Sequence, residues 1–304
     1  MRLLTALIIL AVAHAAPLPL GTVPPGKVLL VILAHHDDHT WEYGVGGAVA
    51  RMIDAGYTGY YVRVTNDEKD GGAGWGRNDQ TNLRETVEAV GRLGIREVIS
   101  LNWRNDHMDS IPLQELRAQL IALIRKYRPD VVFSWNPWGH YDRNPDHRKV
   151  ARAAGEAVWM AGYANVHQEH REAGLAPHRV PFVYYTQRSD YGKGHTPNLA
   201  IEINESHVRR KGEAYWAHKN VRFNPGQARG IRQKLDAWGL AIRELEGLTD
   251  EQAIEKLQKW LMEWSSAETG KANGVKYAEV FYHMDEWHHL PGLRDYVLAN
   301  AVTK

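Results

Sequence analysis

Residues 28–40 read VLLVILAHHDDHT, and this stretch decides how the fold begins. Its first six residues are all apolar, which is typical of a strand buried on both faces of a parallel sheet. The polar residues Ala34 to Thr40 form the loop after this strand. Apolar residues at positions 45, 49, 52 and 53 then fall on one face of a helix.

The same alternation continues through the first half of the chain. Apolar stretches predict strands at 60–65, 98–101 and 131–135, and helical patterns occur at 83–93, 116–127 and 148–160. Strands that alternate with helices form a parallel sheet with helices on both faces. We therefore predict a Rossmann-like α/β fold with a mostly parallel sheet.

The second half is less regular, but no linker, low-complexity tract or repeat separates it from the first. It predicts an edge strand at 182–186, a last strand at 278–282, and helices at 203–219, 227–246 and 250–265. We therefore assign residues 28–304 to a single domain, which is long enough to bury a core without disulfides.

The N-terminus has the layout of a secretory signal. Met1-Arg2 is followed by an apolar run at 3–12 and by Ala13-His14-Ala15. We predict a signal peptide at 1–15, a Pro-rich lead-in at 16–27, and a secreted or periplasmic protein without a membrane span after cleavage. A buried strand or membrane anchor is the alternative for the apolar run.

Composition excludes several classes of function. The chain has 304 residues and no cysteine, which rules out disulfide scaffolds and thiolate metal sites. Its net charge of +1 does not point to a nucleic-acid partner. The expected partner is a small-molecule or glycan substrate.

Two polar loops follow strands of the predicted sheet. One is Ala34 to Thr40, and the other, at 136–147, reads NPWGHYDRNPDH. Ligands bind beyond the carboxyl ends of parallel strands, so both loops are expected at one edge of the sheet. Imidazole and carboxylate groups suit Zn²⁺ and related ions. The loops therefore predict a metal site, with a solvated polar patch as the alternative.

These loops carry a family resemblance. The chain resembles the PIG-L/LmbE-like N-deacetylase superfamily, which has an Ala-His-Pro-Asp-Asp-Glu loop after its first strand and a His-Pro-Asp-His loop later. The resemblance spans residues 28–285. The matching loop residues are Ala34, His35, Asp37, Asp38, Pro145, Asp146 and His147. Further matches include Gly46-Gly47-Ala48, Thr65, Glu68, Glu85, Leu93-Gly94, Lys211, His218 and Tyr277-Ala278-Glu279.

The resemblance implies a Zn²⁺ ion bound by His35, Asp38 and His147, and the same ligands also suit Fe²⁺ or Co²⁺. It implies that Asp37 is the general base. Asp146 is expected to orient a metal-bound imidazole. Zinc lowers the pKa of its water from about 15.7 to about 7, so Asp37 could take a proton near neutral pH.

The chain departs from the family at a position that matters for proton transfer. Asn144 stands where the family usually has His, and an amide can stabilise an oxyanion but has no titratable proton. His218, His140 and Asp37 itself are then candidates to protonate the leaving amine. We favour His218, with a core or surface histidine as the alternative.

Other departures concern substrate recognition. His36 replaces the family's Pro and is expected to contact substrate, with a fourth metal ligand as the alternative; His39 replaces its Glu. Asn82 stands where the family's helix often carries a substrate-facing Arg. Arg84 is the nearby candidate for substrate binding, although it lies roughly 200° around the helix from residue 82.

Three further residues are candidates for substrate binding. Trp75 lies in a Gly-rich loop at 70–76, which lacks the Lys of a P-loop and is interpreted as a mobile rim of the pocket. Asp106 follows the third strand, with an ordinary turn aspartate as the alternative. Tyr141, like Trp135 and Trp138, flanks the second loop as pocket wall or core.

The expected activity is hydrolysis of an N-acyl group, most simply acetyl, from an N-acetylglucosamine-type sugar or glycoconjugate. One alternative is an amidase acting on a non-sugar amide or thiol conjugate. Another is a catalytically weak, secreted carbohydrate-binding protein. The retained Asp37 argues against the last, because binding alone has no need of a base.

Overall fold

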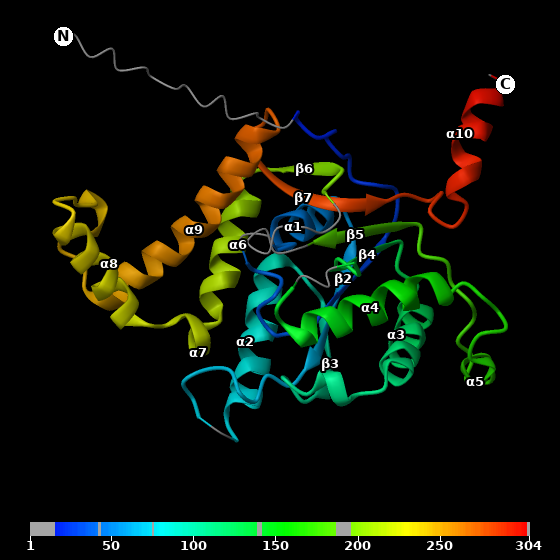
Figure 1. Ribbon diagram of the computed structural model, residues 1–304, viewed down its shortest axis with the longest axis horizontal. Coiled ribbons are helices and arrows are strands. Elements are labelled where there is room, and N and C mark those ends of the chain that lie inside the picture. The colour runs from blue at the N-terminus through cyan, green and yellow to red at the C-terminus, as the bar shows by residue number, and fades with distance from the viewer. Residues whose placement is uncertain (1–15, 42–43, 75, 139–141, 187–195, 303–304) are drawn as a thin grey trace, which may run out of the picture.

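The computed structural model describes residues 16–41, 44–74, 76–138, 142–186 and 196–302, and Figure 1 shows how the elements are arranged. The predicted signal segment at 1–15 lies outside the described residues, as do Trp75, His140 and Tyr141.

A seven-stranded sheet forms the centre of the protein, with strand order β3-β2-β1-β4-β5-β7-β6. The first five strands in the chain run parallel, whereas β7 is antiparallel to both of its neighbours. The Rossmann-like, mostly parallel sheet predicted above is thus confirmed. The strands are β1 (Val28–Leu33), β2 (Thr58–Thr65), β3 (Glu97–Trp103), β4 (Val131–Trp135), β5 (Phe182–Thr186), β6 (Leu199–Ile203) and β7 (Tyr277–Met284).

Helices cover both faces of this sheet, because successive side chains of each strand point to opposite sides. Leu29 and Val31 of β1 pack in one core with residues of α1 and α2, and Leu30 and Ile32 pack in another with residues of α3 and α4. In Figure 1, α6 lies beside α2 and α9, and α3 lies beside α4. The helices are α1 (Gly46–Asp54), α2 (Asn78–Leu93), α3 (Leu113–Tyr127), α4 (Pro145–Met160), α5 (Gln168–Glu172), α6 (Glu205–Ala217), α7 (Lys219–Arg222), α8 (Pro225–Ala237), α9 (Asp250–Ala272) and α10 (Pro291–Asn300).

Three predictions for the second half are wrong. The helix expected at 227–246 is too long, because α8 ends at Ala237. Strand β5 is not at an edge: it lies between β4 and β7, and all five of its residues are buried. Residues 199–203 form the edge strand β6, and the helix that follows starts only at Glu205. Asn204 and His207 form a capping box, in which each side chain accepts a hydrogen bond from the other's backbone N–H, and this sets the boundary.

The Pro-rich lead-in pairs with this edge strand. The Gly21 amide donates to the Ala200 carbonyl at 2.7 Å, and the Ala200 amide donates to the Pro19 carbonyl at 3.0 Å. An exposed strand edge is a template for unwanted pairing, so the lead-in protects β6. None of the helices in the described part of the chain combines the length and apolarity needed to cross a bilayer.

A buried ion pair joins the last strand to α6, and the same carboxylate also binds the first helix. Lys211 Nζ lies 2.7 Å from Glu279 Oε1, and both side chains are almost completely buried. The carboxylate also accepts hydrogen bonds from the amides of Gly47 and Ala48, which have no partner within α1 because they lie in its first turn. Four positions of the family pattern thus meet at one carboxylate.

Candidate metal and catalytic site

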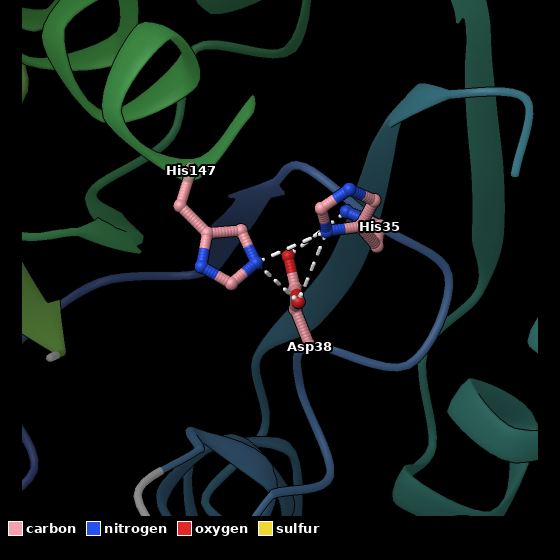
Figure 2. Close-up of side chains that lie close together, drawn as sticks. All are labelled: His35, Asp38 and His147. Carbon is pink, nitrogen blue, oxygen red and sulfur yellow. Dashed lines mark hydrogen bonds and ion pairs between the residues drawn. The ribbon is translucent and has the colours of Figure 1, made fainter. Parts of the chain in front are cut away.

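Three predicted metal ligands converge at the carboxyl ends of β1 and β4 (Figure 2). His35 and Asp38 come from the loop after β1, and His147 lies in the first turn of α4. His35 Nδ1 lies 3.0 Å from His147 Nε2 and 3.5 Å from Asp38 Oδ1, and His147 Nε2 lies 3.1 Å from the same oxygen. All three residues are buried. The parallel pairing of β1 with β4 brings them together across more than 100 residues of sequence.

The Asp38 carboxylate is oriented by two hydrogen bonds to its other oxygen. Asp38 Oδ2 accepts from the His35 backbone amide at 2.8 Å and from Trp135 Nε1 at 3.0 Å. The indole ring also stacks on His147, with ring centroids 4.4 Å apart. Trp135, a residue of β4 that the sequence left as pocket wall or core, therefore holds two of the three ligands in place.

Asn144 holds the second loop in shape as a helix cap. It is the N-cap of α4, and its side-chain oxygen accepts from the amides of Asp146 at 2.9 Å and His147 at 3.4 Å. This cap starts the helix so that both residues lie in its first turn. The oxyanion role predicted for Asn144 uses its side-chain NH₂, the donor of the amide, and the cap engages only the oxygen.

Each imidazole has its own carboxylate partner. His35 Nε2 lies 3.3 Å from Asp146 Oδ2, as predicted for Asp146. Asp146 also accepts from the backbone amides of Asp106 at 2.7 Å and Met108 at 3.3 Å. His147 Nδ1 lies 2.9 Å from Asp142 Oδ2. Asp142 was missed in the sequence, although a carboxylate in the same loop as a ligand was a signal that could have found it.

These contacts fit a bound cation. If each imidazole donates its proton to its carboxylate, His35 Nδ1 and His147 Nε2 present lone pairs to each other and to Asp38. Burial opposes charge on both imidazoles, but Asp38 outweighs it and raises the pKa of His35 and His147. Burial likewise opposes charge on Asp38, yet the two imidazoles hold its pKa well below the usual range. A nitrogen–nitrogen–oxygen set of this kind suits Zn²⁺.

Asp37 has a partner that the sequence did not reveal. Arg222 of α7 forms an ion pair with Asp37 through Nη2 and Oδ2. Its guanidinium packs against two aromatic rings, 4.1 Å from the centroid of Trp41 and 4.4 Å from that of Tyr215. Burial raises the pKa of Asp37, but Arg222 and His36 outweigh it, so the pKa is lowered and the carboxylate is ionised at neutral pH.

Two histidines of the loop after β1 form a buried cluster with one that follows α6. The ring of His218 lies 5.1 Å from that of His36 and 5.3 Å from that of His39. All three side chains are buried, and none of their ring nitrogens has a hydrogen-bond partner within the described structure. Burial, together with the neighbouring histidines, holds the pKa of His218 well below its ordinary value.

This cluster corrects two predictions. Substrate contact by His36 is not supported, because the side chain is completely buried. His218 is unsuited to protonate an amine, because its imidazole stays neutral and is also completely buried. The alternative of a core histidine describes His218 correctly.

The Gly-rich loop after β2 is held by α7 and α2. Asn220 accepts from the Ala73 amide at 2.8 Å through its side chain and from the Gly72 amide at 3.0 Å through its carbonyl. Asn82 donates to the carbonyls of Asp67 at 2.9 Å and Asp70 at 3.0 Å, and is itself fully buried. Asn82 therefore supports this loop. The loop is therefore an anchored segment, whereas the sequence predicted a mobile rim.

The remaining substrate-binding candidates differ in how close they lie to the ligand cluster. Asp106 lies beside the site through its backbone, and its exposed carboxylate pairs with Lys69 at 3.5 Å. Arg84 is exposed, and its guanidinium donates to the Thr81 hydroxyl at 3.1 Å, so it does not join the ligand cluster. Its substrate-binding role is not supported. Trp75 and Tyr141, also predicted to bind substrate, fall outside the described residues.

Two known proteins are similar to this chain in sequence. The chain is 29% identical over 184 residues to the diacetylchitobiose deacetylase of Thermococcus kodakarensis, a match that covers 59% of this chain and 64% of that protein. It is 28% identical over 185 residues to 1D-myo-inositol 2-acetamido-2-deoxy-alpha-D-glucopyranoside deacetylase 2 of Catenulispora acidiphila, covering 52% of this chain and 60% of that protein. The matches thus span less than two thirds of either relative.

The fold is shared with solved structures. The N,N'-diacetylchitobiose deacetylase of Pyrococcus horikoshii superposes with a TM-score of 0.64 at 24% identity, covering 89% of each chain. Residues 30–158, which run from β1 into α4 and contain both ligand loops, match the family described as PIG-L, GlcNAc-PI de-N-acetylase. The chain therefore carries a PIG-L family domain over residues 30–158.

Proposed function

We propose that this protein is a metal-dependent N-deacetylase that hydrolyses the acetamide of an N-acetylglucosamine-type sugar. The observation that carries the proposal is the convergence of His35, Asp38 and His147 with the ionised Asp37 beside them. Two relatives named as deacetylases of acetylated amino sugars support the substrate class.

The three ligands would hold Zn²⁺ or a similar divalent ion. Such an ion, when bound, supplies a Lewis acid that makes water more acidic and polarises the acyl oxygen. Asp142 and Asp146 keep the ring protons of the two imidazoles away from the ligand cluster. Trp135 holds the Asp38 carboxylate in the orientation that faces both imidazoles.

Asp37 is the group that moves protons in this proposal. Arg222 binds Oδ2, and Oδ1 accepts no hydrogen bond from any residue that the structure describes. Oδ1 is thus the oxygen available to take a proton from water as that water attacks the acyl carbon. When the C–N bond breaks, Asp37 returns this proton to the leaving nitrogen. Neither the neutral His218 nor Asn144 could supply it.

Acetate release tests the proposal. Metal-loaded protein is incubated with N,N'-diacetylchitobiose and with N-acetylglucosamine, and free acetate is measured. Asp37→Asn keeps the shape of the side chain but removes the base, so we expect turnover to fall about 10²- to 10⁴-fold with unchanged metal content. Asp109→Asn, at an exposed carboxylate on the surface, is the matched control.

Two results would count against this function. One is the absence of acetate from a broad panel of N-acetyl sugars with fully metallated protein. The other is equal turnover in Asp37→Asn and wild type, because the mechanism then has no use for the base.

One observation favours a second candidate, carbohydrate binding with little turnover. The Arg222 ion pair stabilises the charge of Asp37, and a carboxylate whose charge is stabilised is a weaker base. The same assay separates the candidates. Binding of a chitin oligosaccharide in calorimetry, without acetate release, would support this one.

A further inference from the structure

A second group of metal-type ligands lies next to the first. One ligand atom each from His36, Asp67 and Asp70 lies within 4.8 Å of the others. His36 comes from the loop after β1, and the two aspartates come from the loop after the adjacent strand β2. We propose that His36, Asp67 and Asp70 form a second site for a divalent cation, separate from the His35, Asp38 and His147 ligands.

Buried polar atoms without hydrogen bonds are the first argument, and Asp67 Oδ2 has only longer ion-pair contacts, to Arg63 and His36. His36 and Asp67 are both completely buried, and neither ring nitrogen of His36 nor Oδ2 of Asp67 has a hydrogen bond among the described residues. Native proteins seldom leave buried polar atoms unsatisfied. A divalent cation would satisfy an imidazole nitrogen and a carboxylate oxygen at once, because both are metal ligands.

The spacing of these atoms is the second argument. His36 Nδ1 lies 3.6 Å from Asp67 Oδ2, which is longer than a hydrogen bond. Two ligands that each lie about 2.1 Å from one ion would, at this separation, subtend about 118° at the ion, close to a tetrahedral angle. Asp70 is exposed, so its side chain has room to turn toward the ion and completes the set from the solvent side.

The backbone is held in the required shape without the ion. Asp67 has a φ of 54°, in the left-handed region that a non-glycine residue seldom adopts. Its Oδ1 accepts from the Thr65 hydroxyl at 2.8 Å, which leaves Oδ2 to face His36. Asn82 binds the carbonyls of both Asp67 and Asp70. Strain that the surroundings maintain in this way is characteristic of binding sites.

The charges nearby make the second site weaker than the first. Arg63 Nη1 lies 3.5 Å from Asp67 Oδ2 and opposes a cation there. The Asp37 carboxylate acts in the opposite direction and favours a cation, and burial together with this charge raises the pKa of Asp70. An exposed ligand and a neighbouring guanidinium predict an ion that exchanges readily with solvent.

Zinc stoichiometry tests this site directly. Protein stripped with a chelator is titrated with Zn²⁺ in a calorimeter, and bound zinc is counted after dialysis by mass spectrometry. We expect two equivalents in wild type, with the weaker one lost or weakened at least tenfold in Asp70→Asn. Asp70 is exposed, so this variant should fold, and Asp109→Asn should keep both equivalents.

A further variant separates this site from the proposed deacetylase centre. His147→Gln should remove the tight equivalent and keep the weak one. Zinc beyond the first equivalent should also raise Tm in wild type more than in Asp70→Asn, because the ion joins two loops of the folded state. The proposal is overturned if wild type binds one equivalent, or if Asp70→Asn and wild type give the same isotherm. His36 would then be a charged partner of Asp67 alone.

Discussion

Replacing Trp135 with Phe tests whether the protein orients the proposed metal ligands through neighbours that do not themselves bind the ion. The indole Nε1 donates to Asp38 Oδ2 at 3.0 Å, while the opposite oxygen of that carboxylate faces His35 and His147. Phe keeps an aromatic ring to stack on His147 but removes the donor. The His35 amide, at 2.8 Å, then remains to restrain Oδ2.

The size of the effect follows from the lost hydrogen bond. A hydrogen bond to a charged group contributes about 1.5–3 kcal/mol. Since about 1.4 kcal/mol corresponds to tenfold in affinity, Zn²⁺ should bind roughly 10- to 100-fold more weakly to Trp135→Phe. Loss of groups that orient metal ligands in other proteins has effects of about this size.

Competition with a chromophoric chelator measures this affinity in wild type, Trp135→Phe and Trp138→Phe. Trp138 is 41% exposed and packs edge-on against Tyr185 and Tyr282, so its variant controls for loss of an indole as such. Equal affinity in Trp135→Phe and wild type would refute the reasoning. Tighter binding would also refute it, because it would mean that the indole lowers the basicity of Asp38 more than it orients the carboxylate.

Three further predictions concern stability. The guanidinium of buried Arg125 donates to four backbone carbonyls in the segment between α4 and α5, and a Lys side chain cannot reach all four. Arg125→Lys should therefore lower the free energy of unfolding in urea by about 2–4 kcal/mol, with acetate release at 25 °C unchanged. Glu279→Gln removes the carboxylate charge that faces buried Lys211 and should cost about 3–5 kcal/mol in the same measurement, a loss that adding Lys211→Met should partly reverse. Burial raises the pKa of Asp146, but hydrogen bonds from His35 and two backbone amides outweigh burial and lower this pKa. The carboxylate therefore stabilises the fold above its unfolded pKa of about 3.9, and this stabilisation is lost as pH falls through the folded pKa. Metal-free Asp146→Asn should therefore lose less unfolding free energy than wild type between about pH 5 and about pH 3, and an equal loss in the two proteins would contradict this account.

Local pattern was sufficient for the first half of the protein. The uninterrupted apolar run at 28–33 is buried on both faces, as β1 requires, and the polar loop begins where the strand ends. Parallel strands place their carboxyl ends at one edge, so the loops after β1 and β4 could be expected to meet from the strand pattern alone. The close contact of His35, Asp38 and His147 agrees with this expectation.

Strand order in the second half did not follow from local pattern. The apolar residues 182–186 are equally suited to an edge or an interior position, and the antiparallel β7, which comes almost 100 residues later, decided it. Strand β6 was missed because its five residues run directly into a helix and its pairing partner is β7. Pairing between strands depends on distant partners, and a short stretch of sequence does not encode them.

The sequence by itself predicted the fold class and, through the family resemblance, the residues that converge at the candidate site, because these depend on local periodicity and on residues that lie in two short loops. Only the tertiary structure decided what surrounds them. Arg222 lies 185 residues from Asp37 and has no motif, yet the packing of α7 places its charge on the carboxylate. Burial turned His218 from a candidate acid into a neutral core side chain. Charge and protonation depend on neighbours and solvent exposure, and folding alone creates both.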